Sequence, residues 1–167
     1  MSPTGKFRIG SADSLKVADT EIGDLLGKSY VEAGFTSPER AEAIFEPTAV
    51  RGRGHLICAR PQGNESLAGM VIVVTPDSPA RRIANADEIE LHLLAVDSEY
   101  RGLGLGRDLV ETAIGMANGL GYRKMILWTQ PAMTVAQKLY ESAGFGRTVS
   151  RDPTINGLKF MAYEKQW

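Results

Sequence analysis

The sequence predicts an α/β domain in which about seven strands form one mixed central sheet flanked by four helices. The apolar residues change between helical and strand spacing in the order β-α-α-β-β-β-α-β-α-β-β. The early strands follow one another closely, as in antiparallel hairpins, and the later ones are separated by helices, as in a βαβ crossover. The chain has 167 residues, of which 43% are hydrophobic. This suits a single domain over residues 1–167 with a substantial core.

Helix-ending residues support the assignment of elements. Ser37 suits an N-cap and Pro38 a first helical position, and Pro47 is expected to kink or end the same helix. Gly34 and Gly144 stand where two other helices are expected to stop. The helix-like segments are 19–35, 37–50, 105–120 and 133–143. The strand-like segments are 6–12, 55–60, 67–76, 86–96, 124–130, 145–151 and 158–165.

Composition and charge exclude several classes of protein. The formal net charge is −1, whereas a general nucleic-acid binder carries a basic surplus. The one cysteine, Cys58, cannot form an internal disulfide, and we expect a buried thiol in a reducing compartment. The longest apolar run, "MVIVV", is far shorter than the roughly 20 residues of a membrane helix, and no signal peptide is visible. We therefore expect a soluble cytoplasmic protein that binds neither nucleic acid nor membrane and holds no metal.

The segment "YRGLGLGR" at residues 100–107 is the strongest local sign of a ligand site. It directly precedes a predicted amphipathic helix. A helix N-terminus has unpaired backbone N–H groups and about half a unit of positive charge. Glycines allow the backbone to turn tightly there and to approach a ligand closely. With Arg101 and Arg107 beside it, this segment indicates a site for phosphate or pyrophosphate.

Two familiar phosphate-binding patterns do not fit the loop. In the dinucleotide pattern G-x-G-x-x-G, the last glycine is replaced by Arg107 or Leu109, depending on the starting position. The mononucleotide pattern G-x-x-x-x-G-K-[ST] is absent from the sequence, which disfavours ATP as the ligand. The pattern that does fit is R-x-x-G-x-G, at Arg101, Gly104 and Gly106.

This pattern and its surroundings resemble the GNAT superfamily of N-acetyltransferases, which use acetyl-coenzyme A. The segment "LLAVDSEYRGLGLGRDLV" is similar to the family's strand–loop–helix unit, and "KLYESAGF" is similar to its common helix ending. The order of elements agrees over nearly the whole chain. More narrowly, "GYRKMILWTQPAMTVAQKLYESAGF" resembles the acetyltransferase half of bacterial proteins fused to a MarR-type DNA-binding domain. The resemblance implies a GNAT-like fold and acetyl-CoA as co-substrate.

The resemblance also implies which residues hold the cofactor. Its pantetheine arm is expected to pair with the backbone of the strand before the loop, which needs a locally opened sheet such as a bulge provides. The loop is expected to bind the pyrophosphate, with Arg101 either joining it or bracing the loop. The family's cofactor-contacting asparagine is replaced by Met133, which puts that contact in doubt. The expected cofactor-binding residues are Leu94, Val96, Arg101, Gly102, Leu103, Gly104, Gly106 and Arg107.

The implied reaction is direct attack of an amine on the thioester, and it needs a base and a proton donor. Glu90 stands at the position of the family's glutamate base, and burial would raise its pKa toward a useful range. His92 lies on the same side of the strand and is the alternative base or a relay. Glu88 is a third, weaker candidate. Tyr140 matches the family's tyrosine that protonates the departing thiolate, and it also suits a core position.

The acceptor is less defined, and a small-molecule amine or amino acid is expected. Tyr30 and Phe35 could line an apolar wall, and Glu32 or Glu39 could attract a cationic amine. Trp128 is expected in the core, with a pocket wall as the alternative. A domain that binds coenzyme A without turnover, acting as a sensor or interaction module, is the alternative function. The sequence does not determine the oligomeric state, and a homodimer stays open.

Overall fold

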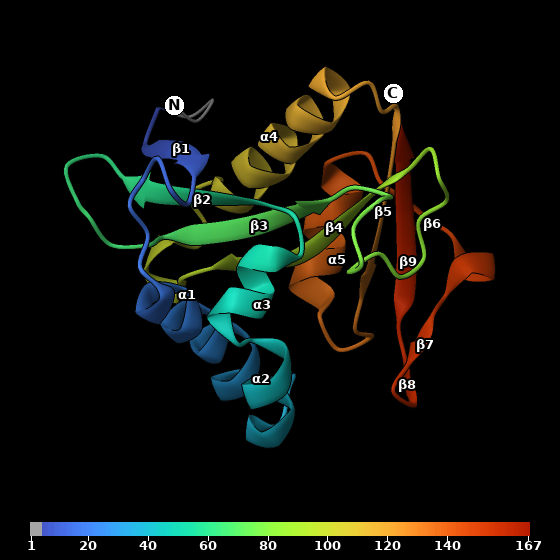
Figure 1. The fold of residues 1–167 in the computed structure, drawn as a ribbon, viewed down its shortest axis with the longest axis horizontal. Helices are drawn as coiled ribbons and strands as arrows, with labels where there is room; N and C mark the ends of the chain where they lie inside the picture. Colours follow the sequence, from blue (N-terminus) through green and yellow to red (C-terminus); the bar gives the residue numbers. More distant parts are fainter. Residues whose placement is uncertain (1–4) are drawn as a thin grey trace.

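A mixed seven-stranded sheet forms the centre of the molecule, as predicted, in a computed structural model that describes residues 5–167. The strand order is β1-β2-β3-β4-β5-β9-β6, and β4 and β5 are its parallel pair (Figure 1). The remaining neighbours are antiparallel. The strands are β1 (Phe7–Ser11), β2 (His55–Pro61), β3 (Gly69–Val74), β4 (Ile89–Val96), β5 (Lys124–Thr129), β6 (Gly146–Arg147) and β9 (Met161–Gln166).

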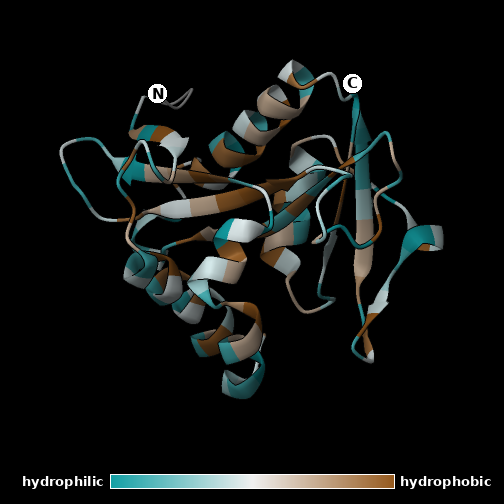
Figure 2. Ribbon diagram, viewed as in Figure 1, coloured by the Kyte–Doolittle hydropathy of each residue, from teal (hydrophilic) through white to brown (hydrophobic). Residues whose placement is uncertain are grey.

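Helices cover both faces of the sheet. Figure 1 shows α4 on one side of β2 and β3, and α1, α2 and α3 on the other. Residues of β2 and β3 alternate between two apolar clusters, so that Ile57 and Val71 pack with α4 and Cys58 and Met70 pack with α1. The strands between these helices are accordingly the most hydrophobic part of the ribbon (Figure 2). The helices are α1 (Asp19–Leu26), α2 (Pro38–Ile44), α3 (Pro47–Gly52), α4 (Leu105–Gly119) and α5 (Thr134–Ser142).

The number of helices differs from the expected four. The predicted helix 37–50 is divided into α2 and α3, because Pro47 starts a new helix whose first N–H groups are capped by the Glu46 side chain. Ser37 and Pro38 start α2 as predicted. The predicted helix 19–35 begins as α1, continues as a π-helical segment, Gly27–Glu32, and ends by Gly34, whose φ is +82°.

The last two predicted strands are shorter than expected. Segment 145–151 contains β6 and then a 3₁₀ turn, Val149–Arg151. Segment 158–165 is divided between β8 (Leu158–Lys159) and β9, and β8 pairs in a separate hairpin with β7 (Thr154–Ile155), which precedes the segment. The Asp152 carboxylate bends the chain here, because it accepts hydrogen bonds from the backbone N–H of Ala162 and from the Arg147 guanidinium. This hairpin borders the cavity described below.

A bulge in β4 and an opening between β4 and β5 prepare the site. The register of β4 against β3 shifts by one residue between the partners of Met70 and Ile72, and Leu93 has a φ of +50°. A leucine rarely adopts this conformation, which costs roughly 1–3 kcal/mol. The parallel pairing of β4 with β5 ends at Leu91 and Leu127. Beyond that pair the two strands part, as the expected backbone pairing of a ligand requires.

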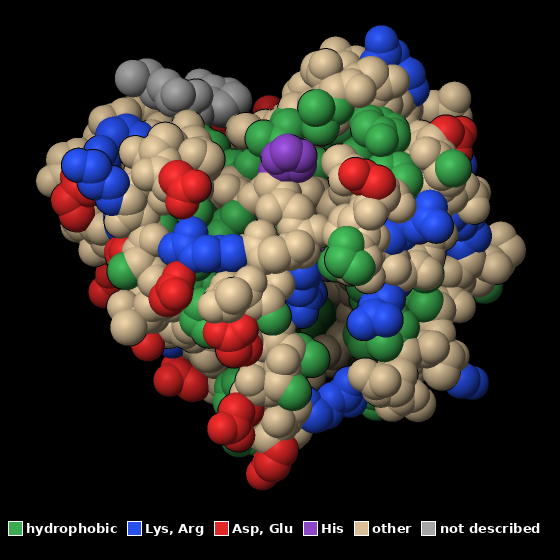
Figure 3. Space-filling view, in the orientation of Figure 1, with side chains coloured by type: hydrophobic (Ala, Val, Ile, Leu, Met, Phe, Trp, Pro, Cys, Tyr) green, Lys and Arg blue, Asp and Glu red, His purple; other side chains and the backbone are tan. Residues whose placement is uncertain are grey.

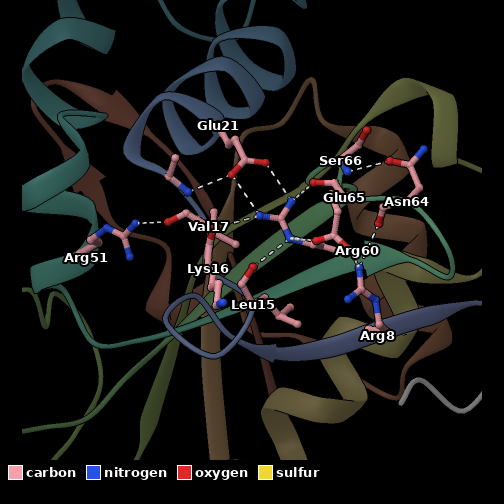
Figure 4. Close-up of polar contacts among 11 residues, drawn as sticks. Arg8, Leu15, Lys16, Val17, Glu21, Arg51, Arg60, Asn64, Glu65 and Ser66 are labelled. Carbon is pink, nitrogen blue, oxygen red and sulfur yellow. Dashed lines mark hydrogen bonds and ion pairs between the residues drawn. The ribbon is translucent and has the colours of Figure 1, made fainter.

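A buried arginine fixes the segment between β1 and α1, away from this opening. Arg60 is 3% exposed and donates hydrogen bonds to the backbone carbonyls of Leu15 and Lys16 and to both carboxylate oxygens of Glu21 (Figure 4). Cys58, two residues earlier on β2, is buried as predicted. Within residues 5–167, the helices are all too short or too polar to cross a bilayer.

Candidate active site

A cavity of about 950 Å³ lies where β4 and β5 part. Its walls come from the α1–α2 connection, the second half of β4, the glycine loop, the first turn of α4, the end of β5, α5 and the β7–β8 hairpin. The space-filling view shows this face hollowed between the part that carries α2 and the β7–β8 hairpin, with Lys or Arg side chains beside the opening (Figure 3). The volume is within the usual range of small-molecule sites.

The glycine loop enters the cavity at the N-terminus of α4. Gly102 and Gly104 have φ values of +74° and +84°, which favour glycine, and Gly104 is the N-cap of the helix. Nε of Arg101 donates to the backbone carbonyl of Val96 at 3.3 Å, so Arg101 braces the loop. Arg107 is exposed and pairs with Glu111 one turn along at 2.9 Å. All four line the cavity, whereas Leu103 does not and is 40% exposed.

The predicted pairing strand borders the same cavity. Leu94 and Val96 both line it, beyond the last residue of β4 that pairs with β5. The Leu94 carbonyl accepts a hydrogen bond from the Tyr30 hydroxyl at 3.0 Å, which leaves one of its two lone pairs for a ligand. Burial raises the pKa of Tyr30 well above its usual range, so this hydroxyl stays a donor.

Glu90 is fully buried on β4, and its carboxylate accepts hydrogen bonds from four groups. The backbone N–H of Arg82 lies 2.8 and 3.0 Å from its two oxygens, and the N–H of Ala84 lies 2.6 Å from Oε1. The N–H of Ile83 donates to the same oxygen. Nε2 of His92 is 2.8 Å from Oε2. Among the described residues, His92 lines the cavity and Glu90 does not.

The charge state of this pair overturns one expectation. Burial raises the pKa of Glu90, but the hydrogen bonds from His92 and the three backbone N–H groups outweigh it, so the pKa lies below its ordinary value. The prediction that burial makes Glu90 a stronger base is therefore wrong. Burial, together with the charges of Arg53 and Arg82, lowers the pKa of His92 by more than its contacts with Glu90 raise it. Because an ionised carboxylate only accepts, Nε2 of neutral His92 donates to Glu90, and Nδ1, 3.5 Å from Nη1 of Arg53, carries the lone pair.

Glu88 has a structural partner at the start of β4. Its carboxylate forms an ion pair with Arg151 at 2.6 and 3.0 Å, and Lys124 lies 3.7 Å away. Burial raises its pKa, but these cations and a backbone hydrogen bond lower it overall. Glu88 lies outside the set of described residues that line the cavity. It ties the 3₁₀ turn before β7 to the sheet.

Tyr140 points from α5 into the cavity wall. It is 6% exposed, and its ring packs against Phe145 and Tyr163 with centroids 5.9 and 6.4 Å apart. Within residues 5–167, no hydrogen bond to its hydroxyl is formed. Burial raises the pKa of this phenol far above its usual range, so it remains protonated and able to donate. The Tyr140 ring thus occupies a core position at the cavity, and protonation of the departing thiolate by its hydroxyl stays a prediction.

Two of the four residues expected to shape the acceptor site line the cavity. Tyr30 and Phe35 line the cavity, whereas Glu32 and Glu39 do not and are exposed. Trp128 was expected in the core, but it is partly exposed and lines the cavity, with its ring edge-on to His92 at 4.8 Å between centroids. The strands part beyond Leu127, which exposes the side chain that follows.

Sequence reasoning missed three arginines of the cavity wall and the Met133 contact. Arg40, Arg53 and Arg82 all line the cavity, from α2, the end of α3 and the segment before β4. Met133 is the N-cap residue of α5, and its sulfur accepts a hydrogen bond from Thr129 at 3.5 Å. The residues around these arginines resemble those of ordinary charged surface segments, so the sequence gave no sign that the arginines line a cavity.

Fold and site together define an α/β domain in which the glycine loop and the N-terminus of a helix open into a cavity between parted strands. Residues 20–145 match the family model described as "Acetyltransferase (GNAT) family". This match covers well over half of the sequence, so the chain belongs to the GNAT acetyltransferase family. The likeness to the acetyltransferase half of MarR fusions remains a prediction.

Curated relatives match parts of the chain. Human N-acetyltransferase 8 is 36% identical over 87 residues, which is 52% of this chain and 37% of that protein. Mycothiol acetyltransferase of Cellulomonas flavigena is 36% identical over 111 residues, 65% of this chain and 29% of that protein. This chain therefore spans only about a third of the length of these relatives.

Solved structures match the fold over nearly its whole length. An acetyltransferase from Streptococcus agalactiae aligns with a TM-score of 0.75 and 18% identity, covering 98% of this chain and 99% of its own. The PaiA N-acetyltransferase from Thermoplasma acidophilum, solved in complex with coenzyme A, aligns with a TM-score of 0.68 and 19% identity, covering 96% and 99%. These likenesses show a common fold.

Proposed function

We propose that this protein is an acetyl-CoA-dependent N-acetyltransferase that transfers the acetyl group to the amine of a small molecule. One observation carries the proposal: the glycine loop at the start of α4 and the neutral His92 side chain line one cavity. The glycine loop is suited to binding a pyrophosphate, and His92 is suited to accepting a proton from an amine. Membership of an acetyltransferase family supports both assignments.

The residues present fit the cofactor. The free N–H groups at the N-terminus of α4 and the Arg107 guanidinium suit the pyrophosphate. The parted edge of β4 at Leu94 and Val96 suits the amide-containing arm of coenzyme A, as an added strand. Acetyl-CoA would supply the thioester carbonyl that the amine attacks.

His92 is assigned as the base, with Glu90 as its positioning residue. Nδ1 of His92 accepts the proton of the acceptor amine, directly or through water, while Nε2 remains bound to Glu90. The Glu90 carboxylate stabilises the imidazolium that forms, as the buried carboxylate of a catalytic triad does. The Tyr140 hydroxyl is assigned to donate a hydrogen bond to the departing sulfur, and its neutral state in a residue that lines the cavity supports this role.

Release of free thiol from acetyl-CoA in the presence of an amine panel tests this proposal. We expect thiol release with an acetylated amine as the product, and a fall of roughly 10²- to 10⁴-fold in kcat for His92→Gln with unchanged coenzyme A affinity. His55→Gln is the matched control, because His55 is exposed and outside the cavity wall. Coenzyme A binding without turnover of any amine would favour the sensor function instead.

A further inference from the structure

Among the described residues, the charged side chains that line the cavity are all positive. Among residues 5–167, five arginines line the cavity, and aspartate, glutamate and lysine are absent from its wall. The chain as a whole has slightly more acidic than basic residues, so the positive lining is local. The arginines are Arg40, Arg53, Arg82, Arg101 and Arg107.

Four of the five arginines form two zones. Arg101 and Arg107 belong to the glycine loop, beyond the end of β4. Arg53 lies beside His92, with Nη1 3.5 Å from Nδ1 of the ring, and its charge interacts with that of Arg82. His92 precedes the bulge of β4, whereas Val96 is the last residue of that strand, before the loop. Arg53 and Arg82 are therefore separate from the phosphate zone.

Arg53 and Arg82 have no acidic partner in the described part of the chain. Arg53 donates to the Ile44 carbonyl at 2.8 Å, and burial and the neighbouring charge of Arg82 lower its pKa. Other arginines of this protein with little exposed surface form ion pairs, such as Arg60 with Glu21 and Arg151 with Glu88. Two guanidiniums of like charge in a cavity favour a bound anion.

The backbone around both arginines is held firmly. The Ser78 hydroxyl donates to the Arg53 carbonyl at 2.7 Å and accepts the N–H of Ala80 at 3.1 Å. The Glu90 carboxylate holds the backbone N–H of Arg82, and Arg151 donates to the Ile83 carbonyl at 2.8 Å. Such support from neighbouring groups is typical of a preorganised binding site.

The spacing of Arg53 and His92 favours a compact anion. Nη1 of Arg53 and Nδ1 of His92 are 3.5 Å apart, so hydrogen bonds of ordinary length to both atoms suit a ligand whose donor and acceptor lie close together. The amine and carboxylate of an α-amino acid are separated by one carbon and meet this condition.

Several apolar side chains also line the cavity. Trp128 lies against His92, and Phe35, Ile44, Leu158 and Phe160 complete this part of the lining. Side chains of this kind favour an apolar group on the ligand.

We propose that the acceptor is an α-amino acid with an apolar side chain, whose carboxylate binds Arg53 and Arg82 while its amine meets Nδ1 of His92. This inference rests on the proposed acetyl transfer and names its acceptor class. In this inference the acceptor is recognised through its carboxylate. The sequence had instead led us to expect that Glu32 or Glu39 attracts a cationic amine.

Matched pairs of acceptors test the inference. Each apolar α-amino acid, such as L-phenylalanine or L-leucine, is compared with its carboxamide and its decarboxylated amine by thiol release from acetyl-CoA. Rates are expressed per concentration of free amine, since the three forms differ in amine pKa. We expect kcat/KM at least tenfold higher for the acid, and a fall of this preference by at least tenfold in Arg82→Ala. Arg82 is exposed, so this variant should fold.

Arg81→Ala is the matched control, because Arg81 is exposed and lies outside the cavity wall. It should keep the preference for the acid. Equal or faster turnover of the carboxamides, or an unchanged preference in Arg82→Ala, would overturn the inference and leave acetyl transfer standing. Absence of thiol release with every amine, while coenzyme A still binds, would overturn the proposed function and this inference with it.

Discussion

Replacing Glu90 with glutamine tests whether the carboxylate works through His92. The carboxamide keeps the shape of the side chain but accepts hydrogen bonds at one oxygen only. Three backbone N–H groups converge on Oε1, so the amide oxygen is expected there and the NH₂ group toward His92. The NH₂ group then donates to Nε2, and the ring proton moves to Nδ1. The atom that should accept a proton from the amine would already carry one.

Glu90→Gln should lower both kcat and the free energy of unfolding. A histidine held in the wrong tautomer by a comparable change loses up to about 10⁴-fold in kcat, so we expect a fall of roughly 10²- to 10⁴-fold for Glu90→Gln. The Arg82 N–H, which is shared between the two oxygens, keeps only its contact with Oε1, and the remaining hydrogen bonds lose their charged acceptor; together this costs about 1.5–3 kcal/mol of the free energy of unfolding. For a chain of this size, that lowers Tm by roughly 3–12 °C.

Steady-state thiol release measures kcat, calorimetry measures the affinity for coenzyme A, and thermal unfolding measures Tm. The affinity for coenzyme A should stay unchanged, because Glu90 is remote from the glycine loop. Glu42→Gln, the same change at an exposed position of α2, should match the wild type. A Glu90→Gln variant with wild-type kcat would refute the tautomer argument, whatever its Tm.

Three further predictions concern the loop, the tyrosine and pH. Gly104→Glu should abolish coenzyme A binding by calorimetry, because it places negative charge and a strained φ at the helix N-terminus, whereas Gly115→Glu, on the same helix with open space around it, should bind normally. Tyr140→Phe should lower kcat at least tenfold with little change in Tm or affinity; an unaffected rate would leave Tyr140 a packing residue. The pKa values of Glu88 and Glu90 are lowered from 4.5 on folding, so their stabilisation is full above that pH and is lost as the pH falls through the folded values. Thermal unfolding at pH 6 and pH 3.5 should show a smaller acid-induced fall of Tm in Glu90→Gln than in the wild type.

The parts of the site that depend on local backbone could be predicted from the sequence. The glycine loop, the helix after it and the stops at Gly34 and Gly144 follow from the conformations that glycine permits, and their φ values agree. Pro47 ended its helix for a similarly local reason. The bulge in β4 was expected only because the resemblance required an open strand, since no residue there marks it.

The parts that depend on long-range partners could not be predicted. The pKa of Glu90 was expected to rise, because its strand position indicates burial but not the N–H groups of residues 82–84 that surround it. For the same reason, the sequence did not indicate that Arg53 and Arg82 line the cavity without an acidic partner among the described residues. Whether an arginine is paired depends on which acidic side chains the fold brings near it, and spacing along the chain does not show this.

The way Glu90 holds the segment before β4 leaves one position open to change. Its carboxylate binds the backbone N–H of Arg82 and makes no contact with the guanidinium among the described interactions. Backbone N–H groups are common to every residue type but proline. Position 82 can therefore accept many side chains while the proton-accepting ring stays in place. With the roles proposed for His92 and Arg82, acceptor choice and proton transfer would be separable, and substitutions at residue 82 would change the acceptor range without displacing the ring.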